Sequence, residues 1–165
     1  MRIVGDHLAE FATKSGDATH LDLFGRSAFN RYYYAAYLIT REMLGQLDPL
    51  WERTSHKSIP DLLRQTVARR IRKEVQQQSG KLISIHEAKQ MRIDANNAVG
   101  TLAALLTSAY AVRCIADYDP AQRVQFASPT FTLFSHSNHE ASGWPKHAAI
   151  HCKTILRIWR TLAIT

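Results

Sequence analysis

The chain has 165 residues, 45% of them hydrophobic, and a formal net charge of +7. This length suits one domain, residues 1–165, with its own core, and no apolar run approaches the roughly 20 residues that cross a bilayer, which argues against a membrane protein. Two cysteines are too few for a disulfide framework, and the first residues carry no apolar signal segment, so we expect a cytoplasmic protein. The positive charge favours an anionic partner, nucleic acid first and an acidic protein second.

Apolar residues recur every three or four positions along much of the chain, which is the period of helices with one buried side. The first predicted helix is short, and its apolar positions are Ile3, Val4, Leu8 and Phe11. A long helix follows over about 21–45 and ends where Asp48 and Pro49 break the chain.

Three consecutive tyrosines lie in this long helix. Successive helical residues are about 100° apart, so the three side chains fan around the helix and at least one faces solvent, a cleft or a partner. We expect Tyr32 to lie in the core, and the pattern leaves open which of Tyr33 and Tyr34 does not.

The third helix is predicted to begin with a capping box formed by Ser58 and Asp61, with Pro60 in its first turn. Its apolar positions are Ile59, Leu62, Leu63, Thr66, Val67, Ile71 and Val75. On the opposite side lies a basic stripe of Arg64, Arg69, Arg72 and Lys73.

Ser84 and Glu87 predict a second capping box and another helix start. Residues 96, 97 and 100 are Asn, Asn and Gly, which can interrupt this helix before the Ala- and Leu-rich segment that follows. That segment is predicted to be the most buried helix, and it ends at Asp119 and Pro120.

The last part of the chain is less regular. Residues 130–134 resemble a strand, but a lone strand has no partner, so we expect an ordered loop there. Pro145 is predicted to open a final helix with Ala148, Cys152, Ile155, Leu156, Trp159 and Leu162 on its apolar side. The sum is an all-α chain, an up-and-down bundle of five to six helices.

Three segments in this order resemble the HEPN superfamily of helical nucleotide-binding proteins. They are residues 26–37 (RSAFNRYYYAAY), residues 56–60 (HKSIP) and residues 113–120 (RCIADYDP), the last similar to the Arg-x-x-Ala-Asp-Tyr-Asp-Pro ending of one bacterial branch. The resemblance implies a compact helical bundle that pairs as a homodimer, binds RNA or a nucleotide and acts in toxin–antitoxin or phage-defence systems, where a cognate partner protein is possible.

Many members of this family are metal-independent ribonucleases. They use an Arg followed after four to six residues by a His, where the Arg holds phosphate charge and the His moves a proton. Here the three corresponding positions after Arg113 hold Tyr118, Asp119 and Pro120. The resemblance therefore implies a catalytic role for Arg113, with Tyr118 or His56 in place of the missing His.

A binding cleft is predicted where the long helix meets the segment 113–118. The candidate nucleic-acid contacts are Asn30, Arg31, Tyr33, Lys57 and Asp117, together with the basic stripe Arg64, Arg69, Arg72 and Lys73. For each residue the alternative is a structural role in helix packing, helix termination or a solvated helix surface.

Other chemistry is less well supported by the sequence. His136, His139, His147 and His151 have partly metal-like spacing, but no acidic residue accompanies the helical pair at 147 and 151, so we expect no metal and no cofactor. Three function classes stay open: a binding protein for RNA or a nucleotide, a metal-independent endoribonuclease with a degenerate motif, and a non-catalytic scaffold or regulatory subunit of a defence complex.

Overall fold

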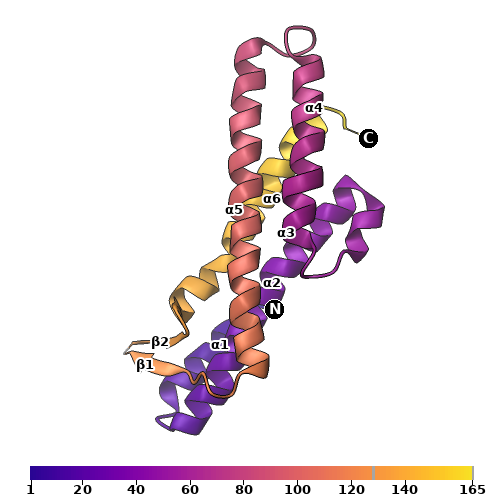
Figure 1. Cartoon of the computed structure of the whole chain (residues 1–165). Helices are drawn as coiled ribbons and strands as arrows, with labels where there is room; N and C mark the ends of the chain where they lie inside the picture. Colours follow the sequence, from indigo (N-terminus) through magenta and orange to yellow (C-terminus); the bar gives the residue numbers. More distant parts are fainter. Residues whose placement is uncertain (128, 165) are drawn as a thin grey trace. The chain divides into compact units, whose positions relative to one another are not determined.

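The computed structural model describes residues 1–127 and 129–164, and 77% of the chain is helical (Figure 1). The elements in chain order are α1 (Arg2–Lys14), α2 (Ala18–Leu47), η1 (Pro49–Arg53), α3 (Ile59–Asp61), η2 (Leu62–Val67), α4 (Ala68–Gln78), α5 (Ile85–Tyr118), β1 (Gln125–Ala127), β2 (Thr130–Leu133), β3 (His136–Ser137) and α6 (Asn138–Thr161). The expected helical class is confirmed in this coarse form, with a small three-stranded sheet added.

The chain folds as two compact units. Unit 1 comprises Met1–Leu38 and Leu106–Lys146, and unit 2 comprises Ile39–Leu105 and His147–Thr165. Each of α2, α5 and α6 therefore contributes one part to each unit.

The core of unit 1 forms around aromatic residues of α2 and the sheet. Phe29 and Phe131 are fully buried and meet edge to face, with ring centroids 5.9 Å apart. Gly25 allows the sheet to approach this closely, because a Cβ there would lie 3.1 Å from Val124 and 3.2 Å from Phe131. Glycine lowers the intrinsic stability of α2 at this position, but its lack of a side chain permits the tight packing against the sheet.

The expected buried side of α1 is wrong. Ile3, Val4 and Phe11 are 70%, 48% and 51% exposed, whereas the buried residues are Gly5, Ala9 and Ala12. Helix α1 packs through its small residues because it comes very close to α2: a Cβ on Gly5 would lie 2.7 Å from the Tyr32 ring. Periodicity identified the helix, and close packing selected a different side.

The expected loop at residues 130–134 is also wrong. Strand β2 pairs antiparallel with both β1 and β3, in the order β1-β2-β3, so it does have partners. Phe131 and Leu133 are buried and alternate with partly exposed threonines, which is the pattern of a strand with one face on the core. The partner strands have three and two residues, too few to show an alternation of their own.

Helix α6 begins earlier than Pro145, contrary to the sequence-based expectation. It begins at Asn138, where the Ser137 hydroxyl accepts a hydrogen bond from the Glu140 N–H at 3.1 Å, as an N-cap residue does. Pro145 consequently lies inside the helix. The predicted apolar side is otherwise correct, and its buried members are Ala148, Cys152, Ile155, Trp159 and Leu162.

In unit 2 the chain is continuously helical from α3 through η2 to α4. The helix begins at Ile59 as expected, but Ser58 makes no side-chain capping bond and instead contacts the Ser55 hydroxyl at 2.8 Å. The predicted apolar stripe is confirmed in its main members, which are Ile59, Leu63, Val67, Ile71 and Val75. These recur every four residues, and the wider π-helical turn of η2 lets that spacing stay on one side.

Helix α5 begins with the predicted capping box: Glu87 accepts from the Ser84 N–H at 2.9 Å, and the Ser84 hydroxyl accepts from the Glu87 N–H at 3.2 Å. The interruption that residues 96, 97 and 100 could cause does not occur, and one helix runs to Tyr118. Of the helices in the described chain, α5 alone is long and apolar enough to cross a membrane, with a mean hydropathy of 1.5, and buried core helices give the same weak signal.

Candidate functional site

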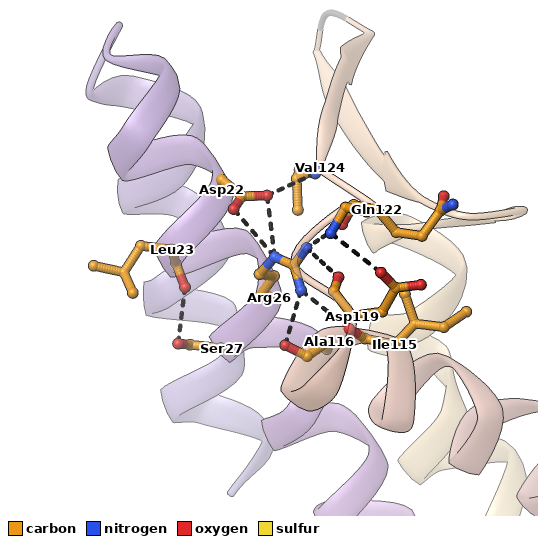
Figure 2. A network of polar contacts seen from close by, with 10 residues as sticks. Asp22, Leu23, Arg26, Ser27, Ile115, Ala116, Asp119, Gln122 and Val124 are labelled. Atoms are coloured by element: carbon orange, nitrogen blue, oxygen red, sulfur yellow. Dashed lines mark hydrogen bonds and ion pairs between the residues drawn. The ribbon is translucent and has the colours of Figure 1, made fainter.

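The C-terminal end of α5 is held in unit 1 by an arginine of α2 (Figure 2). The Arg26 guanidinium donates to the carbonyl oxygens of Ile115 and Ala116 at 3.0 Å each, to that of Asp119 at 2.9 Å and also to that of Gln122. The last carbonyls of a helix have no partner within the helix and carry partial negative charge. Arg26 therefore caps α5 from outside.

Asp22 completes this network one helical turn earlier on α2. Its two carboxylate oxygens each lie 3.1 Å from Nε of Arg26, and Oδ1 also accepts from the Val124 N–H at 2.8 Å. The Arg26 side chain is only 12% exposed, and its charge is balanced by the Asp22 carboxylate and by the backbone carbonyl oxygens at the end of α5. The residue therefore has a structural role, and the sequence signal for it was the Asp–Arg spacing of four residues.

The predicted site around Arg113 forms a second polar cluster in the same unit. Nη2 of Arg113 lies 2.7 Å from Oδ2 of Asp117, 3.4 Å from the Tyr118 hydroxyl and 3.5 Å from the Tyr34 hydroxyl. The guanidinium carbon also lies 5.2 Å from the centre of the Tyr118 ring and 5.9 Å from that of Tyr34, within cation–π range. We call Asn30, Tyr34, Arg113, Asp117 and Tyr118 the Arg113 cluster.

The electrostatics of the Arg113 cluster favour a permanently charged guanidinium. Burial acts to lower the pKa of Arg113, but the hydrogen bond to Tyr118 and the charge of Asp117 outweigh it, so the pKa is raised. Asp117 also accepts a hydrogen bond from the Asn30 amide. Within the described chain, Nε of Arg113 and Oδ1 of Asn30 are buried without a hydrogen-bond partner.

The structure brings together four of the predicted residues and replaces a fifth. Asn30, Arg113, Asp117 and Tyr118 meet as expected, but Tyr34 takes the place foreseen for Tyr33. Tyr33 is 1% exposed, and burial raises the pKa of its hydroxyl. The residues of α2 that reach the end of α5 are spaced by four, namely Arg26, Asn30 and Tyr34.

Arg31, His56 and Lys57 do not belong to the Arg113 cluster. Arg31 is exposed on α2, and its guanidinium lies 4.0 Å from the sulfur of Met1. His56 and Lys57 lie in unit 2, between η1 and α3, where His56 is partly buried and Lys57 is exposed.

The basic stripe lies on unit 2, and its four residues, Arg64, Arg69, Arg72 and Lys73, are all exposed. None of them forms an ion pair with a described residue. The whole net charge of the chain belongs to this unit: unit 2 has 14 Lys and Arg against 7 Asp and Glu, whereas unit 1 has 7 of each. The positive field predicted from composition is therefore concentrated in unit 2.

A hydrogen-bonded series in unit 1 was not foreseen. Nε2 of His136 lies 3.0 Å from the Ser108 hydroxyl, and Nδ1 lies 2.8 Å from Oε1 of Glu140. This is the order of side chains in a hydrolase triad. Ser108, however, lies well inside α5, where backbone N–H groups are engaged in the helix and do not form an oxyanion hole. The series instead ties β3 and the start of α6 to α5.

The remaining histidines form no metal site in the part of the chain that is described, where no three His, Cys, Asp or Glu side chains gather. Burial, and next the neighbouring His147, lower the pKa of His151.

Comparison with known proteins found no match: no family model, no curated protein and no solved structure matches this chain.

Proposed function

We propose that this chain is a nucleic-acid-binding protein, with RNA as its partner, and that unit 2 carries the binding surface. The observation that supports this is the location of the entire +7 net charge in unit 2. Cations that already have acidic partners gain little from a phosphate, whereas Arg64, Arg69, Arg72 and Lys73 have none among the described residues. An exposed row of such side chains suits the regular spacing of phosphates along a nucleic acid.

The Arg113 cluster supports this function less directly. The Arg113 side chain is 16% exposed and its charge is already neutralised by Asp117, so a phosphate would have to displace that carboxylate. We propose that the cluster mainly joins α2 to the end of α5. Membership of the HEPN superfamily, with its homodimer and its toxin–antitoxin or defence setting, rests on the sequence resemblance alone.

A metal-independent endoribonuclease is the second candidate. The observation in its favour is that Arg113 Nε and Asn30 Oδ1 are buried without partners beside Tyr118, a cost that proteins often accept at functional sites. A scaffold in a protein complex is the third candidate, and it predicts neither binding nor cleavage of RNA.

One experiment separates the three. Labelled RNA is incubated with the protein and a metal chelator, and both cleavage and fluorescence anisotropy are followed between about 50 and about 200 mM salt. With four phosphate contacts on a single strand, affinity should fall about 50-fold over this range. Cleavage that disappears in Arg113→Ala would favour the nuclease, and absence of both signals would favour the scaffold.

The double variant Arg69→Gln/Lys73→Gln tests the surface itself. We expect it to lower RNA affinity about tenfold and to reduce the slope of log affinity against log salt by about 1.4. The matched control is Arg123→Gln/Lys146→Gln, which removes two exposed charges from unit 1. Equal losses in the two double variants would show that net charge alone is responsible and would contradict a surface on unit 2.

A further inference from the structure

We propose that a groove between α4 and the start of α5, within unit 2, binds a nucleoside phosphate. This inference rests on the proposed function, because it specifies which part of an RNA unit 2 recognises. The phosphate would lie against Arg72, Lys89 and Arg92, and the base against Ile85.

Helices α4 and α5 form a hairpin (Figure 1), and residues of both helices line the groove. Helices α4 and α5 run side by side where a short connection joins them, at the end where Gly80 takes a left-handed backbone conformation with φ +74°. The groove has a volume of about 610 Å³. Both walls repeat at i, i+4 and i+7, and they consist of Arg72, Gln76 and Ser79 on α4 and of Ile85, Lys89 and Arg92 on α5.

The charges around the groove are arranged for an anion. Arg72 approaches from one wall, and Lys89 and Arg92 approach from the other. None of the three is paired with an acidic side chain of the described chain, and no lining residue is acidic. The nearest acidic residues along the sequence have other partners. Glu74 accepts from Gln78 at 2.9 Å and Glu87 accepts from the Ser84 N–H at 2.9 Å. Asp94 accepts from Gln90 at 2.8 Å and pairs with Arg157 at 3.4 Å. The groove therefore presents concentrated positive charge.

The floor of the groove is apolar, and Ile85 adds one apolar side chain to the α5 wall. Val75 and Ala88 form the floor at 4% and 5% exposure, and Ile85 stands beside the cations with 75% of its surface exposed. Inorganic phosphate has no apolar surface that could contact Ile85. In a duplex the faces of the bases are stacked on one another and are not available for such a contact. An unpaired nucleotide offers both an anionic phosphate and a flat base with apolar faces. Charge and apolar surface together thus favour an unpaired nucleotide over a duplex.

The test uses the full chain with three probes: AMP, a short single-stranded RNA and the same RNA as a duplex. The groove variant is Lys89→Gln/Arg92→Gln, and the matched control is Arg123→Gln/Lys146→Gln, which removes two exposed charges from unit 1 and leaves both the groove and the basic stripe intact. We expect the groove variant to bind the single strand about tenfold more weakly than the control does, with little difference for the duplex. Circular dichroism and the unfolding midpoint show that both variants are folded.

The apolar contact is tested by Ile85→Ser, at an exposed position where folding is not at risk. This variant should lose several-fold of the preference for single strand over duplex while keeping the salt dependence of the wild type. AMP titrated by calorimetry identifies the source of the nucleotide: AMP binding that is lost in the groove variant indicates a free nucleotide, and a single-strand effect without AMP binding indicates a nucleotide within RNA. Either result supports the groove.

The outcomes also separate this inference from the proposed function. Salt-dependent RNA binding with equal effects of groove and control variants, and equal affinity for single strand and duplex, would overturn the groove and leave the RNA-binding function standing. AMP binding that is lost in the groove variant, without any RNA binding, would uphold the groove and overturn the function. If the wild type binds none of the three probes, both proposals are wrong.

Discussion

The carboxylate of Asp117 lies 2.7 Å from the guanidinium of Arg113, one turn earlier on the same helix, and it also accepts the Asn30 amide from α2. The positive charge of Arg113, the central residue of the predicted site, is thus neutralised by a carboxylate within unit 1. This pairing explains why we place the phosphate-binding surface elsewhere, on side chains of unit 2 that have no acidic partner among the residues described.

Replacing Arg113 should affect stability more than binding. Arg113→Ala leaves the Asp117 carboxylate without its guanidinium partner, and we expect the free energy of unfolding to fall by about 2 kcal/mol, less than for a fully buried pair because Asp117 is 24% exposed. RNA affinity should change by less than about twofold. Urea unfolding and anisotropy measure the two quantities. If Arg113→Ala lost much of its RNA affinity while its stability stayed unchanged, Arg113 would belong to the RNA-binding site after all.

Arg26 should be one of the most sensitive positions in the chain. Arg26→Gln removes the cap on α5 and leaves Asp22 without its guanidinium, so we expect unfolding to become easier by about 3 kcal/mol. The control is Arg31→Gln on the same helix, where an exposed side chain should contribute no more than about 0.5 kcal/mol. Similar denaturation midpoints for the two variants would show that the capping network contributes little.

Replacing glycine by alanine should lower the stability of the protein at position 25 and raise it at position 100. Gly25→Ala would place a Cβ 3.1 Å from Val124, and such overpacking should cost about 1–3 kcal/mol. Gly100→Ala lies in the middle of α5, where no atom is within 4 Å of the added Cβ, and it should stabilise the protein by about 1 kcal/mol. Thermal unfolding of the two variants reads out the signs directly. Stabilisation by Gly25→Ala would mean that the sheet packs less tightly against α2 than described.

Cys152 should make stability depend on alkaline pH. Burial raises the pKa of its thiol from 9.0 to about 12. The unfolded chain therefore loses this proton first, so the stabilising contribution is complete below about pH 9 and is lost as pH rises towards 12, by about 1.4 kcal/mol per pH unit. We compare the free energy of unfolding of the wild type and Cys152→Ala between about pH 8 and about pH 11. A constant difference over that range would contradict the pKa shift.

The helices could be predicted from the sequence because their apolar period is long and regular. Ile59, Leu63, Val67, Ile71 and Val75 are buried as the pattern indicates. The side of α1 that packs could not be predicted, because small residues such as Gly5 and Ala9 carry little hydrophobic signal although they permit the closest approach. The strand over Thr130–Leu133 could not be predicted, because its partner strands have only three and two residues and show no strand pattern in the sequence.

Much of the Arg113 cluster could be anticipated, although its exact members could not. The choice between Tyr33 and Tyr34 depends on how far α2 is rotated about its own axis, which periodicity within one helix does not determine. The spacing of four from Asp22 through Arg26 and Asn30 points to Tyr34, and that line of residues was available in the sequence. The groove was missed because it needs two helices to be placed side by side.

The wide turn of η2 means that the helical segment over residues 59–78 holds one residue more than an ordinary α-helix along the same path. Leu62–Val67 offsets part of the drift of a four-residue repeat, which in an ordinary α-helix is about 40° at each step. A π turn contains about one residue more than an α turn, so removing a single residue there would rewind the turn as α-helix and leave the helix beyond it in nearly its present orientation. Removing a residue within α4 would instead rotate the helix that follows by about 100° and turn its buried residues towards water. A one-codon deletion should therefore be tolerated in η2 but not in α4.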